Sequence, residues 1–229
     1  LFTQLSKVIG LKEELLYENK RFIADTVHQI RTPLTNIMMN NEMIKLIQKD
    51  EVTSEYIDQI NASINMLSNS YEDLAYITSY GTIEYKPAPL SLTTILEKRI
   101  RFFATISKVN FKELRFDIEK NLIIQINEIE IERIIDNNLT NDIKYGTVHQ
   151  PITIILMKKE NQIIVEFKSY GNPIKNKVDI FEKNYRENES KRGLGLGLNM
   201  VKTICKKYDI QYKVVYEEGQ NIFHYIFKH

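Results

Sequence analysis

A helical repeat interrupted by one proline, near the start of the chain, constrains the fold more than any other feature. Apolar residues recur there in alternating steps of four and three, at Ile23, Val27, Ile30, Leu34 and Ile37. Such spacing is typical of a helix in a coiled coil or a helical bundle. Pro33 lacks the backbone donor that would reach the carbonyl of Gln29, so we expect the helix to bend at this point.

His28 lies beside this apolar stripe, displaced by about 100° around the helix. A structural histidine would point inward and find a partner, whereas this position should face solvent. An exposed imidazole one turn before a bend indicates a reactive nucleophile. The alternative is an ordinary surface histidine, and the rest of the chain must decide between the two.

A second apolar stripe follows a break in the pattern near residues 49–54. Its members are Ile57, Ile60, Ile64, Leu67, Tyr71 and Leu74. Two such helices joined by a short turn form a hairpin. Each stripe needs partners on more than one side, and two hairpins forming a four-helix bundle would supply them. The pattern therefore predicts a homodimer; the alternative is that the second helix packs on the other domain.

Gly81 and the Pro-Ala-Pro segment at residues 87–89 mark a domain boundary. Beyond it, helical and strand patterns mix. We expect helices over residues 91–106, 128–145 and 194–208, and strands over residues 113–118, 122–126, 151–157, 162–167, 211–216 and 222–227. This mixture predicts a two-layer α/β sandwich. Residues 186–192 are polar without an apolar anchor, so we expect a mobile loop there.

Composition excludes several classes of function. The 31 basic and 30 acidic residues leave a net charge of +1, which gives no electrostatic footprint for nucleic acid. The single cysteine, Cys205, rules out an internal disulfide and fits a reducing compartment. No apolar run approaches the ~18 residues of a membrane span. Since the sequence begins with Leu, we expect a cytoplasmic part of a longer protein, whose sensor and membrane anchor lie elsewhere.

Three alternating glycines precede the helix expected at residues 194–208. Gly193, Gly195 and Gly197 would let backbone amides approach an anion at the electropositive start of that helix. A dinucleotide-binding reading fails because Leu198 stands where the third glycine should be and a polar loop precedes the motif. A flexible linker is the other alternative, but the leucines between the glycines require burial. We therefore favour a triphosphate-binding turn.

Four motifs in order resemble those of the sensor histidine kinases of two-component signalling. The first is F-x-x-D-x-x-H-x-x-R-T-P-L at residues 22–34, which is similar to that family's phosphoacceptor box. The others are N-x-x-x-N-x-x-K-Y at residues 137–145, F-E-K-N-Y-R at residues 181–186 and G-L-G-L-G-L at residues 193–198. They are similar to the N, F and G2 boxes. The resemblance implies a histidine-kinase/gyrase/chaperone type of ATPase sandwich after the helical hairpin.

With this resemblance, we divide the chain into four parts. Residues 1–21 would form a signal helix, residues 22–80 the dimerisation and phosphotransfer domain, residues 81–90 a linker and residues 91–229 the catalytic ATP-binding domain.

The resemblance implies a site for ATP and Mg²⁺. Its nucleotide-binding residues would be Asn137, Asn141, Lys144, Tyr145, Ser169, Gly171, Arg186, Gly193, Gly195, Gly197 and Leu198. Asn141 would coordinate Mg²⁺ through its amide oxygen, which suits a hard cation. Lys144 and Arg186 would neutralise phosphate charge, and Tyr145 would flank the nucleotide.

Four positions depart from the family's pattern. Ser169 stands where the family has an aspartate that accepts the adenine amino group, and Pro173 replaces a glycine of the same box. A neutral hydroxyl makes a weaker hydrogen bond than a carboxylate, so adenine selection is affected. Asp142 replaces the small residue that usually follows the metal-binding asparagine. Gln29 replaces an acidic residue and cannot act as a base.

The implied reaction is transfer of the γ-phosphoryl group of ATP to His28 and then to an aspartate of a response regulator. Thr32, four residues on and on the same helix face as His28, matches a position that orients water for dephosphorylating the regulator. Two alternatives remain open. One is a non-catalytic dimeric scaffold that binds the regulator, suggested by Ser169 and Gln29. The other is an ATPase of the gyrase or chaperone type, which would have no use for the His28 box.

Overall fold

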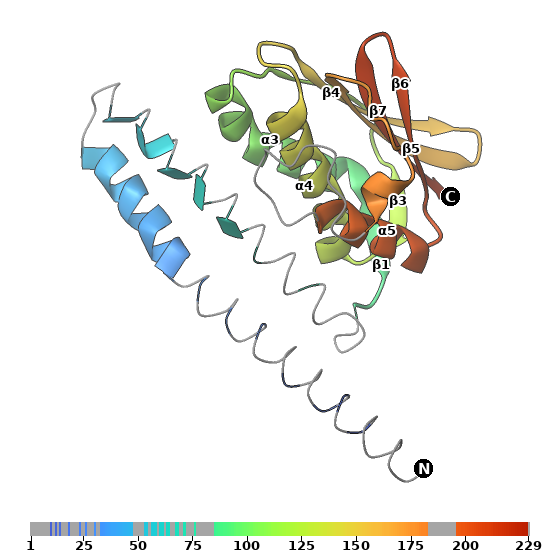
Figure 1. Ribbon diagram of the computed structural model, residues 1–229, viewed down its shortest axis with the longest axis horizontal. Coiled ribbons are helices and arrows are strands. Elements are labelled where there is room, and N and C mark those ends of the chain that lie inside the picture. Colours follow the sequence, from blue (N-terminus) through green and yellow to red (C-terminus); the bar gives the residue numbers. More distant parts are fainter. Residues whose placement is uncertain are drawn as a thin grey trace. The chain divides into compact units, whose positions relative to one another are not determined.

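The chain forms two compact units, Leu1–Glu84 and Tyr85–His229, in a computed structural model (Figure 1). The structure describes residues 85–182 and 196–228 continuously. In the first unit it describes residues 33–47 and separate positions between 10 and 30 and between 53 and 76. None of the helices formed by these residues is long and apolar enough to cross a membrane.

The first unit is helical at every described position, in agreement with the predicted hairpin. Polar contacts join its two helical segments: the Asn41 amide donates to Asn61 (2.9 Å), and Lys45 pairs with Asp58 (2.7 Å). Because residue 41 meets residue 61 while residue 45 meets residue 58, the segments run antiparallel. The buried apolar side chains among the described positions are Leu34, Ile57, Ile64 and Tyr76.

The second unit contains helices and strands in mixed order. They are β1 (Ala88–Ser91), α3 (Leu92–Val109), β2 (Leu114–Ile118), β3 (Ile123–Ile126), α4 (Glu128–Tyr145), β4 (Ile152–Lys159), β5 (Gln162–Tyr170), the 3₁₀ turn η1 (Asp179–Phe181), α5 (Gly197–Lys207), β6 (Gln211–Glu217) and β7 (Gln220–Lys228). Side-chain caps begin two of the helices: Ser91 accepts from Thr94 at α3, and Asn127 accepts from Ile129 at α4.

The main sheet has the strand order β2-β4-β5-β7-β6. Helices α3, α4 and α5 cover one of its faces (Figure 1). Burial alternates along β4, where Ile152, Ile154 and Leu156 point into the core between the two layers. This arrangement confirms the predicted two-layer α/β sandwich.

The structure differs from the sequence-based prediction in two elements and one pairing. Strand β1, which includes Pro89, pairs antiparallel with β3 in a separate two-stranded sheet. The prolines indicated a break there, but a proline is compatible with an edge strand. The turn η1 gave no periodic signal because it is only three residues long. Strand β2 runs parallel to β4, a pairing that the strand pattern did not indicate.

Candidate functional site

Helix α4 presents two polar stripes on different faces. Asn137, Asn141 and Tyr145 follow one another at intervals of four, so they share a face, and all three are partly exposed. Asn138 and Asp142 are one position further on and are buried. The first stripe is therefore available to a ligand, and the second lies against the sheet.

Two hydrogen-bonded pairs fasten the buried stripe of α4 to neighbouring strands. The Asn138 amide donates to the hydroxyl of Tyr225 in β7 (2.9 Å). One turn later, the hydroxyl of Ser169 in β5 donates to Oδ1 of Asp142 (2.6 Å). These pairs fix the rotation of α4 about its own axis, which in turn sets the direction of Asn137 and Asn141.

Asp142 is a buried acid with only one of its two oxygens satisfied. Its residue is 3% exposed, and Oδ2 has no hydrogen-bond partner among the described residues. Burial raises the pKa of this carboxyl to about 7, although the Ser169 hydrogen bond and the charge of Lys112 oppose the rise. Sequence reasoning assigned Asp142 no role, because its partner Ser169 is 27 residues away along the chain.

A buried lysine closes the C-terminal end of α4. Lys112 donates to the carbonyl oxygens of Asp142 (2.9 Å), Ile143 (2.8 Å) and Gly146 (2.6 Å). The last carbonyls of a helix lack intrahelical partners and carry partial negative charge, so a cation stabilises them. Sequence reasoning missed Lys112, since a lone lysine after a helix normally reads as a surface residue.

The loop that follows β5 is held in place by one asparagine. Asn221 in β7 accepts from the backbone amide of Ile174 (3.1 Å) and donates to the carbonyl of Asn172 (2.9 Å). The amide of Gly171 adds a bond to the carbonyl of Gly219 (3.2 Å). The stretch containing Gly171 and Pro173 is therefore anchored beside the end of α4.

Helix α5 approaches α4 closely at its first residue. A Cβ atom on Gly197 would lie 1.8 Å from Oδ1 of Asn137, so a larger residue would have to displace the end of that side chain. At the opposite end, Lys207 pairs with the buried Glu130 of α4 (2.7 Å). These contacts join α4 and α5, and the first of them brings together predicted site residues that are 60 positions apart in the sequence.

The other described site residues lie around this junction. Leu198 is partly buried in the first turn of α5. The ammonium of Lys144 lies 4.9 Å from the centre of the Tyr145 ring. Helix α5 also holds η1, because the Asn199 amide donates to the carbonyl of Phe181 (3.1 Å).

Several predicted site residues lie outside the described part of the chain. They are His28, Gln29, Thr32, Arg186, Gly193 and Gly195. The loop predicted at residues 186–192 and most of the signal helix predicted at residues 1–21 lie outside it as well. The described residues therefore account for the N-box side of the predicted site, Ser169, Gly171 and the end of the glycine motif.

A metal ion bound near α4 would require several ligand atoms from side chains close to one another. No group of three or more His, Cys, Asp or Glu side chains that could hold an ion occurs among the described residues. Asn141 offers an amide oxygen on the partly exposed stripe. Such a sparse oxygen set fits Mg²⁺, which keeps several waters and is commonly shared with substrate phosphates.

Two family models match the chain in succession. Residues 18–80 match the His Kinase A (phospho-acceptor) domain, and residues 126–227 match the histidine kinase-, DNA gyrase B-, and HSP90-like ATPase. The first match lies within the first compact unit and the second match within the second. The sequence is thus similar to an acceptor domain and to an ATP-binding domain on one chain.

Known proteins show the same similarity over most of the chain. The sensor histidine kinase YkoH of Bacillus subtilis is 25% identical over 89% of this chain and 46% of its own length. The sensor histidine kinase HprS of Escherichia coli is 26% identical over 91% and 45%. The full-length ShkA structure in complex with AMPPNP has a TM-score of 0.62 at 18% identity, covering 90% of this chain and 45% of ShkA. The chain therefore spans slightly less than half the length of these relatives.

Proposed function

We propose that this chain, which belongs to the sensor histidine kinases of two-component signalling, binds ATP in its second unit and transfers the γ-phosphoryl group to His28. One observation carries the proposal: a match to a phosphoacceptor domain precedes a match to an ATP-binding domain on the same chain. A gyrase- or chaperone-type ATPase would not require the first match.

The nucleotide would bind along the partly exposed stripe of α4 and the start of α5. Asn137 and Gly197 already meet there, which supports a shared site for the N box and the end of the glycine motif. Lys144 would neutralise phosphate charge, and Asn141 would hold Mg²⁺ through its amide oxygen. Bound in this way, Mg²⁺ would offset negative charge on the phosphates.

The acceptor nitrogen of His28 must be neutral to attack phosphorus. An unperturbed imidazole, with a pKa of ~6.5, is mostly neutral at pH 7 or above. A nitrogen–phosphorus bond forms as the bond from the γ-phosphorus to the bridging oxygen breaks, and ADP leaves. Gln29 cannot take the proton that the imidazole then loses, so we assign this proton to solvent.

The phosphoryl group would pass from His28 to an aspartate of a response regulator. Thr32, one helical turn after His28, would orient water when the regulator is dephosphorylated. The functional form would be a homodimer, because described members of both apolar stripes, including Ile37 and Ile60, are exposed in the single chain.

Autophosphorylation with γ-labelled ATP and Mg²⁺ tests this function. The chain should acquire label that is stable in alkali and lost in acid, as expected for a nitrogen–phosphorus bond. His28→Asn should abolish labelling. His149→Asn is the matched control, because it removes an exposed histidine of the second unit at a left-handed position that asparagine tolerates. Label that persists in His28→Asn would refute the assignment.

A further inference from the structure

The buried carboxylate of Asp142 has an oxygen that the described part of the chain leaves without a donor. Ser169 has a single hydroxyl hydrogen and donates it to Oδ1. Lys112 is the cation whose charge acts on this carboxyl, but its ammonium donates to three backbone carbonyls. Within the described residues, neither neighbour has a hydrogen left for Oδ2.

Buried polar atoms in folded proteins nearly always have a hydrogen-bond partner, so an exception requires an explanation. Asp142 directly follows Asn141 in α4, and its partner Ser169 lies two residues before Gly171. The unsatisfied oxygen thus belongs to a residue that follows Asn141 in the chain and is hydrogen-bonded to Ser169, and both neighbours carry predicted roles at the nucleotide. A donor supplied by the ligand would explain why the chain itself provides none.

The chemistry of the oxygen restricts the donor. In its ionised form the Asp142 carboxyl only accepts hydrogen bonds, so Oδ2 then favours an N–H group and repels a carbonyl. Among purine bases, adenine has an amino group at position 6, whereas guanine has a carbonyl oxygen there. A base with the 6-amino group therefore complements Oδ2, and one with a 6-oxo group opposes it.

We infer that Asp142, in helix α4, accepts a hydrogen of the adenine amino group, the role for which the resemblance pointed to Ser169 in strand β5. Ser169 is then a positioning residue, since its hydrogen bond holds Oδ1 and leaves Oδ2 for the base. The carboxylate and the small polar residue have exchanged places between the helix and the strand. This inference rests on the nucleotide binding proposed above.

Calorimetric titration of the full chain with two ligands tests the inference. The ligands are ATP and purine riboside 5′-triphosphate, which lacks only the 6-amino group. The unaltered chain should bind ATP about tenfold or more tightly, as expected for a hydrogen bond to a charged group. In Asp142→Asn, Ser169 would hold the amide oxygen and the amide NH₂ would face the amino group, so this preference should vanish. Glu132→Gln, a neutralised acid elsewhere on α4, should retain it.

Two variants at residue 169 distinguish a positioning role of Ser169 from direct recognition of adenine by its hydroxyl. Ser169→Asp alone would place two carboxylates together and weaken ATP binding, whereas a serine that read adenine itself would be improved by the change. The exchange Asp142→Ser with Ser169→Asp should restore the ATP preference that Asp142→Ser alone loses. The loss in Asp142→Ser decides the question even if Asp142→Asn does not fold. Circular dichroism monitors folding of each variant.

Three results would overturn the inference. The first is equal affinity of the unaltered chain for the two triphosphates, which leaves nucleotide binding intact. The second is an Asp142→Asn variant whose preference stays within about twofold of the original. The third is failure of the unaltered chain to bind either ligand, which would refute the proposed function as well.

Discussion

At the scale of single residues, Gly197 permits the closest approach between α4 and α5. Its missing side chain leaves space for Oδ1 of Asn137, and any Cβ would overlap that atom. Asn137 cannot retreat freely, because its amide also donates to the carbonyl of Arg133 (3.1 Å). A side chain at residue 197 would therefore have to displace the Asn137 amide from this bond, independently of any role of the glycine toward phosphate.

Gly197→Ala should lower the free energy of unfolding by about 1–3 kcal/mol, the usual cost of overpacking a tight contact. Gly171→Ala is the matched control, since its Cβ would meet its nearest neighbours at 3.7 and 3.8 Å, an ordinary contact distance. Urea unfolding followed by circular dichroism compares the two. Equal stability of the two variants would contradict the packing argument.

The sequence indicated most of the site residues on α4 but not how they are paired. Helical spacing was enough to place Asn137 and Asn141 on one face of α4. The pairing of Asp142 with Ser169 could not be predicted, because it depends on how α4 docks on β5. Lys112 was missed for the same reason: its three acceptors belong to a helix end 30 or more residues away.

At the scale of elements, the spacing of apolar residues in the sequence located every long helix and strand of the second unit. The bounds predicted for α4 agree with the structure because Asn127 caps its start and Gly146 follows its end. Strand β1 and the parallel β2–β4 pair were not predicted. Both depend on which strand lies alongside, and periodicity within one strand contains no information about its neighbour.

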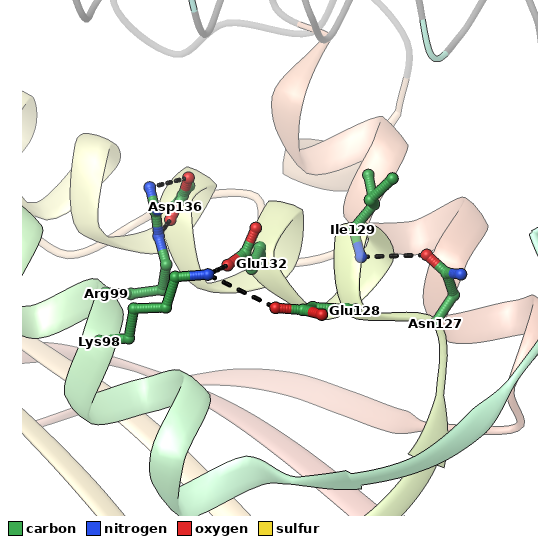
Figure 2. Close-up of polar contacts among 7 residues, drawn as sticks. All are labelled: Lys98, Arg99, Asn127, Glu128, Ile129, Glu132 and Asp136. Atoms are coloured by element: carbon green, nitrogen blue, oxygen red, sulfur yellow. Dashed lines mark hydrogen bonds and ion pairs between the residues drawn. The ribbon is translucent and has the colours of Figure 1, made fainter.

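Helices α3 and α4 are joined by two kinds of ion pair (Figure 2). Arg99 forms a bidentate ion pair with Asp136, in which both nitrogen–oxygen distances are 2.6 Å. The two side chains are only 13% and 19% exposed. Lys98 instead reaches Glu132 at 2.9 Å and Glu128 at 3.4 Å, and the side chains of Lys98 and Glu128 are both more than half exposed. Geometry and burial therefore favour the arginine pair.

Double-mutant cycles should separate the two pairs. Replacing Arg99 and Asp136 by alanine, singly and together, should give a coupling energy of about 1–3 kcal/mol. The reason is that a bidentate, partly buried ion pair is stronger than an exposed one. The same cycle for Lys98 and Glu128 should give less than about 0.5 kcal/mol. Chemical unfolding supplies all the values, and similar couplings for the two pairs would contradict the expectation.

At the scale of the whole molecule, the described apolar positions of the first unit divide into two sets. Leu34, Ile57 and Ile64 are buried within the single chain. Other large apolar side chains are exposed, namely Ile37, Met39, Met43, Ile44, Leu46, Ile47, Tyr56, Ile60 and Leu67. A set of this size on one hairpin exceeds the scattered apolar residues normal on a protein surface and fits a face covered by a second copy.

The proposed dimer should therefore depend on exposed members of the second apolar stripe. Ile60 and Leu67 are 45% and 44% exposed, and changing both to Glu would place four charges in the bundle of a dimer. Multi-angle light scattering at micromolar concentration should report twice the chain mass before the change and mainly the single mass after it. Val178→Glu, at a 74% exposed position of the second unit, should leave the dimer intact. A dimer that survives the double change would mean that the copies associate through another surface.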